Sequence, residues 1–120
     1  MERQPKIGYK AVICPPKRWC ILAVEIPDHA IVVDCGDGHY RADRVIPRKL
    51  SPVHTKTAIW QDTMTYSYYD PNFYYLINTM ATAYLAHECY GAYASGIHFF
   101  DTFGAAVKWG EKFCYNHIPF

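Results

Sequence analysis

Histidine and cysteine side chains fall in two short pairs in the last third of the sequence. His87 and Cys89 lie two residues apart, and Cys114 and His117 lie three apart. Zinc is commonly bound by four Cys or His ligands in a tetrahedron, so the two pairs could form one site. The spacing of His87 and Cys89 is not that of a usual zinc knuckle, and apolar neighbours also explain both cysteines as small core residues. The sequence leaves this metal site as an alternative and predicts no cofactor.

A second chemical arrangement would use Cys89 as a nucleophile and His98 as its base. This pair needs a third group to orient the base, and the sequence identifies none. His98 lies between Ile97 and Phe99 in an apolar run. We therefore expect a structural histidine that is neutral and hydrogen-bonded to the backbone or to a nearby hydroxyl. No catalytic residue is predicted, and a protein that is not an enzyme is the favoured interpretation.

Basic residues could bind a phosphate group or a nucleotide. The candidates are Arg41 and Arg44, which lie near further Lys and Arg residues of the first half of the chain. The alternative is an ordinary solvated strand face. The net charge of only +1 favours that alternative and argues against general attraction to nucleic acid or membranes.

Tyrosine, which occurs eleven times, supplies the other candidate binding residues. Residues 57–77 read as a hairpin of two strands around the turn Asp70-Pro71-Asn72. Its aromatic rings could stack on bases or on a ligand ring, or could simply pair across the two strands. One face of a hairpin stays outside the core, so we expect a contact surface there. The best candidates are Tyr66, Tyr68 and Tyr74.

The elements that must position these residues are mostly strands. Apolar alternation or continuous apolar runs predict strands over residues 7–14, 19–26, 31–35 and 39–46, the last ending at Pro47. Gly36-Asp37-Gly38 is typical of a tight hairpin turn. An antiparallel meander is the simplest arrangement of these strands.

The second half adds the helical elements. Helical spacing predicts a helix over residues 79–89. Residues 96–100 predict a buried strand that leads into a helix capped by Asp101 or Thr102 and ended by Gly110. Residues 112–118 could form a last strand. The predicted fold class is α+β, an antiparallel sheet meander with one or two helices in the C-terminal half, and residues 1–120 are expected to form one globular domain.

The five cysteines are odd in number, and the polar amino terminus predicts no secretory signal. We therefore expect a reducing compartment and free thiols, including Cys14 and Cys20 on either side of a proline turn. No apolar run approaches the ~20 residues of a membrane span, so no membrane contact is expected.

Several motifs resemble an uncharacterised domain family of large DNA viruses and phages, whose members often lie beside pentapeptide repeats. The resemblance rests on Tyr69-Asp70-Pro71-Asn72-Phe73, Glu88-Cys89 and Gly96-Ile97-His98-Phe99-Phe100 with Ala105-Ala106 behind it. Residues 22–27 and 40–44 resemble the family's amino-terminal strands, so the likeness covers most of the chain. This sequence departs from the family by extra residues between Cys89 and Gly96 and by having no pentapeptide array. The resemblance implies a viral setting and no activity.

The run Gly96-Ile97-His98-Phe99-Phe100 is also similar to the Gly-Ile-Tyr-Phe strand of ADP-ribosyltransferases. Those enzymes need a His-Gly pair on an earlier strand and a later Glu on a separate strand. The sequence has no His-Gly pair, and Glu111 follows too closely. The chemistry of these enzymes would therefore be missing even if the fold were related.

Together these features predict a small non-enzymatic viral protein that acts by protein–protein binding. It would be a particle component, or a factor that engages a host or viral partner or a second copy of itself. We expect it in the host cytoplasm or the virion. The alternative is a nucleotide-binding or ADP-ribosyltransferase-like domain.

Overall fold

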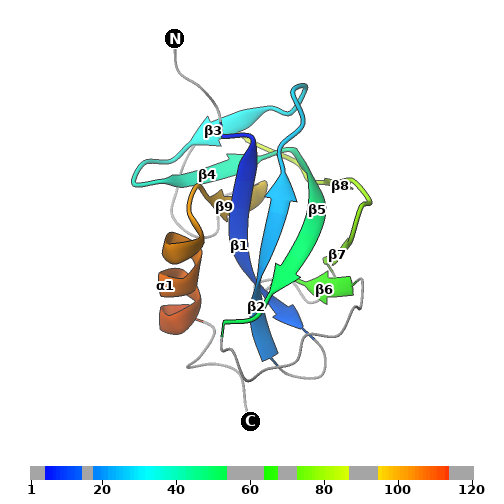
Figure 1. Ribbon diagram of the computed structural model, residues 1–120. Coiled ribbons are helices and arrows are strands. Elements are labelled where there is room, and N and C mark those ends of the chain that lie inside the picture. Colours follow the sequence, from blue (N-terminus) through cyan, green and yellow to red (C-terminus); the bar gives the residue numbers. More distant parts are fainter. Residues whose placement is uncertain (1–4, 15–17, 54–63, 68–72, 87–94, 114–120) are drawn as a thin grey trace.

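Three strands of eight residues form the middle of the sheet (Figure 1). They are β1 (Ile7–Cys14), β2 (Arg18–Glu25) and β5 (Arg44–Ser51). This computed structural model describes residues 5–14, 18–53, 64–67, 73–86 and 95–113. β1 and β2 pair antiparallel along their whole length, and β5 pairs antiparallel with the other edge of β2. The strands predicted from the first two apolar runs are confirmed.

Shorter strands extend the sheet on both sides of this centre. They are β3 (Val32–Asp34), β4 (His39–Ala42), β6 (Met64–Tyr66), β7 (Tyr74–Leu76), β8 (Ala81–Thr82) and β9 (Ile97–Phe100). The order across the sheet is β3-β4-β9-β1-β2-β5-β8, and β6 pairs with both β1 and β7. β9 thus lies between β4 and β1, although it is far from both in sequence. Every pairing between these strands is antiparallel, which confirms the predicted α+β class.

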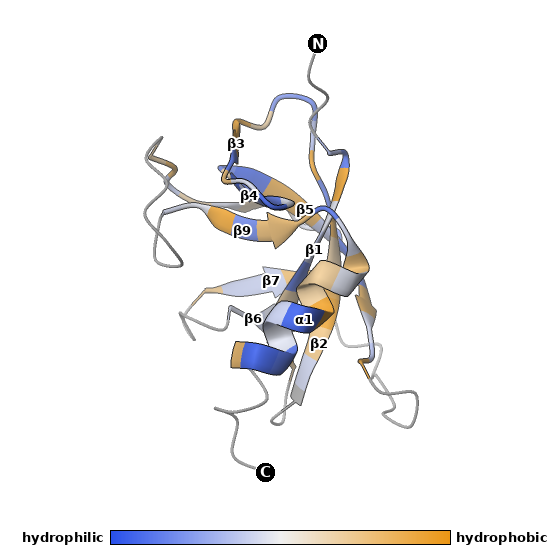
Figure 2. Cartoon of the chain, turned by 90° about the vertical axis from the view of Figure 1, so that its left-hand side faces the viewer, coloured by the Kyte–Doolittle hydropathy of each residue, from blue (hydrophilic) through white to orange (hydrophobic). Residues whose placement is uncertain are grey.

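Apolar side chains cover both faces of the sheet. One face buries a cluster that includes Leu22, Val45 and Phe99. The other face buries Trp19 and Ile21 beneath the helix α1 (Phe103–Phe113). Figure 2 shows α1 lying across the sheet with its more polar residues outward. Within the described residues, no helix is long and apolar enough to cross a membrane.

The strand that leads into a capped helix is confirmed. The Ala105 amide donates a hydrogen bond to the Thr102 hydroxyl oxygen at 3.2 Å, so Thr102 caps the first turn. The predicted end of this helix at Gly110 is wrong, because α1 continues to Phe113. Gly110 is buried inside the helix, where the absence of a side chain lets α1 approach Trp19 closely.

Two further predictions of secondary structure are wrong. The expected strand over residues 39–46 is two strands that bend at Asp43, and β5 continues through Pro47 to Ser51. Pro47 is tolerated inside the strand because it lies at a bulge in the β2–β5 ladder. The helix over residues 79–89 is absent from its described part, 79–86, which contains β8 paired with β5.

The predicted carboxy-terminal strand and hairpin are described only in part. Lys112 and Phe113, the first residues of the expected strand over 112–118, belong to α1, and residues 114–118 lie outside the described part of the chain. The expected hairpin within residues 57–77 is represented by β6 and β7, which pair antiparallel from Met64–Leu76 to Tyr66–Tyr74.

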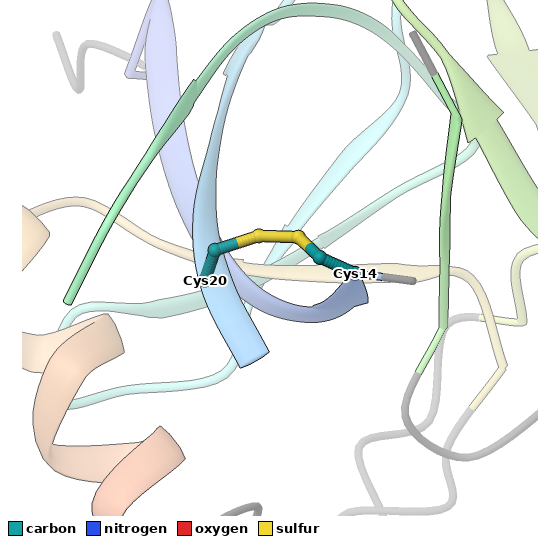
Figure 3. Close-up of a disulfide and its surroundings, with 2 residues drawn as sticks. All are labelled: Cys14 and Cys20. Atoms are coloured by element: carbon teal, nitrogen blue, oxygen red, sulfur yellow. A yellow bond between two sulfur atoms is a disulfide. The ribbon is translucent and has the colours of Figure 1, made fainter. Parts of the chain in front are cut away.

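The expectation of free thiols at Cys14 and Cys20 is also wrong. Their sulfur atoms are joined in a disulfide, with a Cα–Cα distance of 6.5 Å (Figure 3). In the β1–β2 register, Cys14 lies opposite Arg18 and Cys20 lies opposite Val12, so the two cysteines are diagonal neighbours on one face of the hairpin. This register places them within bonding range. The disulfide removes the support that these two residues gave to a reducing compartment.

Candidate functional site

The side chains of β7 alternate between the core and the outside. Tyr75 is buried, and its hydroxyl accepts a hydrogen bond from Lys10 Nζ at 2.9 Å. The same ammonium lies 5.1 Å from the centre of the Tyr75 ring, at the ring edge that carries the hydroxyl. Tyr74 and Leu76 point the other way and are exposed. β7 therefore buries Tyr75 in the core and leaves Tyr74 exposed.

The predicted contact residues Tyr66, Tyr68 and Tyr74 differ in exposure and in whether the structure describes them. Tyr66 is half-buried and lies opposite Tyr74 in the β6–β7 register. The structure thus brings Tyr66 and Tyr74 together across two strands. Tyr68 lies outside the described residues.

Exposed apolar side chains continue beyond β7, on the segment that leads into and past β8. Met80 and Tyr84 follow Leu76, and the exposed fractions of Tyr74, Leu76, Met80 and Tyr84 are 52%, 37%, 41% and 81%. We call these four residues the β7–β8 surface. In Figure 1 this segment lies on the opposite side of the sheet from α1.

The backbone beneath the β7–β8 surface is held in place. Asn78 has a φ of 65°, and its amide donates a hydrogen bond to the Pro47 carbonyl oxygen at 2.7 Å. The Asn78 side-chain oxygen accepts a hydrogen bond from Arg48 Nη1 at 2.8 Å. The Ala83 amide donates to the Asp43 carbonyl oxygen at 2.9 Å. The apolar side chains therefore project from a segment that is fixed against β5 and its preceding bend.

The outer edge of β7 is open in the described part of the chain, where its strand partner is β6. The Ser67 amide donates to the Phe73 carbonyl oxygen at 2.8 Å, so Ser67 and Phe73 form a hydrogen-bonded pair. In an antiparallel ladder, every second pair of opposite residues is hydrogen-bonded. By this alternation Thr65 and Tyr75 form the next hydrogen-bonded pair, and the backbone N–H and C=O of Tyr74 point away from β6. An extended segment of another chain could pair with them.

Sequence reasoning placed Leu76 in the expected hairpin without naming it as a contact residue, and it missed Met80 and Tyr84 because it treated residues 79–89 as a helix. The composition carries no matching signal, because both parities of residues 74–84 contain apolar side chains. The period of two is visible in the exposure. Even-numbered residues from 74 to 84 are exposed, whereas most of the odd-numbered ones are at least partly buried. That alternation is typical of an extended segment on the surface of a sheet.

The basic candidates do not lie together on an open face. Arg41 is fully buried and donates hydrogen bonds from Nε to Cys35 Sγ at 3.3 Å and from Nη1 to the Ser95 carbonyl oxygen at 2.5 Å. Arg44 is half-buried and forms an ion pair with Asp43 at 2.8 Å. Hydrogen bonds from Arg44 lower the pKa of the Asp43 carboxyl. Both guanidinium groups are engaged by other groups of the chain, Arg44 by Asp43 at the surface and Arg41 in the interior, where it tethers the segment before β9.

His98 makes a contact that the sequence did not predict. It is half-buried, and its Nδ1 lies 2.9 Å from Nε2 of His39 on the neighbouring strand. The two rings lie edge to edge and nearly coplanar, with their centres 5.0 Å apart and 21° between their planes, and the Phe100 ring stacks on His39 with centres 5.2 Å apart. Burial lowers the pKa of His39, and the positive charges of Arg41 and Lys10 lower it further. The hydrogen bond agrees with the expected structural role, but the partner is an imidazole.

The proposed metal ligands His87, Cys89, Cys114 and His117 all lie outside the described residues, as does the cysteine of the pair Cys89 and His98. Among the residues that the structure describes, no group of three or more His, Cys, Asp or Glu side chains could hold a metal ion.

Comparison with known protein families matches residues 1–106 to a family of unknown function, DUF5758. Comparisons with curated proteins and with solved structures find no significant match. The family match covers most of the chain, including every described strand and the first turn of α1.

Proposed function

We propose that this chain, which belongs to the family of unknown function DUF5758, acts by binding another protein through the β7–β8 surface. The observation that carries this proposal is the exposure of four large apolar side chains within one eleven-residue segment, Tyr74 to Tyr84. Contiguous exposed apolar surface on a soluble domain marks interaction sites. Tyrosine and methionine are also enriched in protein–protein interfaces.

The fixed backbone supports the same proposal. A surface that is ordered before binding loses less conformational entropy when the partner arrives. The hydrogen bonds of Asn78 to β5 provide such order in the middle of the segment.

The proposed mode is strand addition at β7. A partner segment in extended conformation would pair with the outward N–H and C=O of Tyr74 and place alternate side chains beside Tyr74 and Leu76. Main-chain hydrogen bonds would supply part of the affinity, and the apolar side chains would supply the selectivity.

We propose a viral setting for this interaction, in the host cytoplasm or the virion. The protein would be a particle component or a factor that engages a host or viral partner. The support is the resemblance of Gly96-Ile97-His98-Phe99-Phe100 and the associated motifs to domains of large DNA viruses and phages.

The test compares three forms of the purified chain as bait in lysate of a candidate host and in lysate of infected cells. They are the wild type, the triple variant Tyr74→Ala/Leu76→Ala/Tyr84→Ala, and the control variant Ile7→Ala/Ile31→Ala. The control residues are 54% and 53% exposed but lie elsewhere on the molecule. All three forms should unfold at similar urea concentrations, because surface substitutions usually change stability by less than about 0.5 kcal/mol each.

We expect a protein that the wild type and the control retain and the triple variant loses. A triple variant that retains the same proteins as the wild type would overturn the proposal, as would a triple variant that unfolds because the side chains are core residues. Sedimentation velocity over a range of concentrations examines self-association. A dimer that the triple variant alone cannot form would assign the surface to a second copy of the chain.

A further inference from the structure

The histidine pair, His39 and His98, lies where two strands distant in sequence meet. In the β4–β9 register His39 is opposite Phe100 and Arg41 is opposite His98, so the two imidazoles are diagonal neighbours on one face. Their nitrogen atoms lie 2.9 Å apart, and their rings are nearly coplanar and meet edge to edge, as a hydrogen bond between ring nitrogens requires. A hydrogen bond between two imidazoles needs one N–H donor and one lone pair, so at least one ring must be neutral.

The hairpin β3–β4 depends on this junction. In the sheet β3 pairs with β4, and the other edge of β4 pairs with β9. β9 in turn pairs with β1 at Tyr9–Phe100 and connects the hairpin to the central strands. A change at the histidine pair therefore acts on the contact that joins the β3–β4 hairpin to the centre of the sheet.

The charged surroundings of the pair favour its neutral form. Arg41 lies on the same face and is buried, and Lys10 on β1 adds a second positive charge near His39. The first turn of α1 carries no acidic residue. The remaining titratable groups on these strands, the turn and the junction are Tyr9 on β1, Asp34 on β3, Cys35 and Asp37 in the β3–β4 turn, Tyr40 on β4, and Asp101 between β9 and α1. None of their carboxylates contributes to the pKa shift of His39.

We propose that the histidine pair is an acid-sensitive contact that holds the β3–β4 hairpin on β9 at neutral pH and releases it when both imidazoles are protonated. Two protonated rings have no lone pair for the shared hydrogen bond, and their N–H groups and like charges would face each other near the Arg41 guanidinium. Release is local, because β1, β2 and β5 are held by their own ladders.

The sign of the pH effect follows from His39. Its pKa is lowered in the folded protein, by burial first and by Arg41 and Lys10 second. As the pH falls below the ordinary histidine value of 6.5, the opened form takes up a proton more readily than the closed form. The stabilising contribution is therefore fully present above that pH and is lost as the pH falls through the lowered pKa of the folded state.

Hydrogen exchange followed by mass spectrometry between pH 7.5 and pH 5 tests this proposal, with rates corrected for the intrinsic pH dependence of exchange. A step that binds one extra proton changes an opening constant by up to about tenfold per pH unit. Below pH 6 we expect the protection of residues 39–42 and 97–100 to fall by a factor that approaches tenfold per pH unit. Protection of β1 and β2 should fall much less, because opening is local.

The double variant His39→Gln/His98→Asn removes both titrations, and its amides can still form a hydrogen bond. Its β4 and β9 amides should lose the extra acid sensitivity. The control His29→Gln, at an exposed histidine away from the pair, should behave like the wild type. The same acid sensitivity in the double variant, or a parallel loss of protection in β1 and β2 of the wild type, would overturn the proposal.

A second measurement applies if the double variant does not fold. NMR titration of the imidazole Cε1–H signals in the wild type should show His39 titrating below the ordinary histidine value of 6.5, with both members of the pair changing over a linked pH range. If His39 titrates at or above that value, the proposal is wrong.

Discussion

Gly110 allows the sharpest energetic prediction, because a single methyl group there would collide with the core. A Cβ atom built at Gly110 would lie 2.0 Å from Cζ3 of Trp19 and within 2.6 Å of two further atoms of the same ring. Trp19 is buried, so its ring cannot swing into solvent. Gly110→Ala should therefore force the helix away from β2 or displace the indole.

The magnitude follows from two opposing terms. Alanine is favoured over glycine inside a helix by about 1 kcal/mol. Overpacking of a buried site typically costs roughly 1–3 kcal/mol, and three atoms of one rigid ring place this site near the upper limit. We expect the free energy of unfolding to fall by about 1–2 kcal/mol.

Gly104 in the same helix provides the matched control. Nothing lies within 4 Å of a Cβ atom built there, so Gly104→Ala should keep the favourable helix term and raise stability by up to about 1 kcal/mol. Urea unfolding followed by circular dichroism measures both variants, and near-ultraviolet dichroism reports the environment of Trp19. If Gly110→Ala is as stable as Gly104→Ala, the close approach of α1 to β2 is not as described.

Four further variants test three separate features, each by urea unfolding against the wild type. Cys14→Ser/Cys20→Ser should lower the free energy of unfolding by roughly 2 kcal/mol, because the disulfide removes the entropy cost of closing a short loop. The intact mass of the wild type should lack two hydrogens, and two free thiols there would contradict the disulfide. Thr65→Val should raise the free energy of unfolding by about 1 kcal/mol, because the buried Thr65 hydroxyl has no hydrogen-bond partner within the described residues. A loss of stability would show that the hydroxyl has a partner. Arg41→Met should lower the free energy of unfolding by about 2–4 kcal/mol, because it leaves buried acceptors without a donor. Arg48→Met, at an exposed ion pair, should lower it by less than about 1 kcal/mol. Equal losses of stability in the two variants would refute the burial argument.

Local signals in the sequence predicted the parts of the fold that depend on neighbouring residues. The turn Gly36-Asp37-Gly38 has positive φ at all three residues, as its composition predicts. Thr102 was one of two predicted caps and accepts the expected hydrogen bond. In both cases the conformation is decided within a few residues of the motif.

Contacts between distant segments decided the parts that the sequence did not predict. The apolar spacing of Ile77, Met80 and Tyr84 fits a helix as well as an extended segment, and pairing of β8 with β5 selects the extended one. His39 and His98 are 59 residues apart, so their contact depends on the β4–β9 register. No local pattern specifies that register. Of the β7–β8 surface, Tyr74 was among the predicted contact residues, whereas the other three were missed because their exposure depends on strand pairing.

The central position of β9 has a consequence for how the chain folds during synthesis. β4 and β1 both pair with β9, yet β9 is the last of the described strands to leave the ribosome. Until about residue 100 has emerged, these two strands present unpaired edges that can recruit other chains. Closing the sheet then requires contacts across most of the sequence, which places folding in the range of milliseconds to seconds that is typical of high contact order. We infer that the nascent chain is most prone to aggregation in the interval before β9 is released.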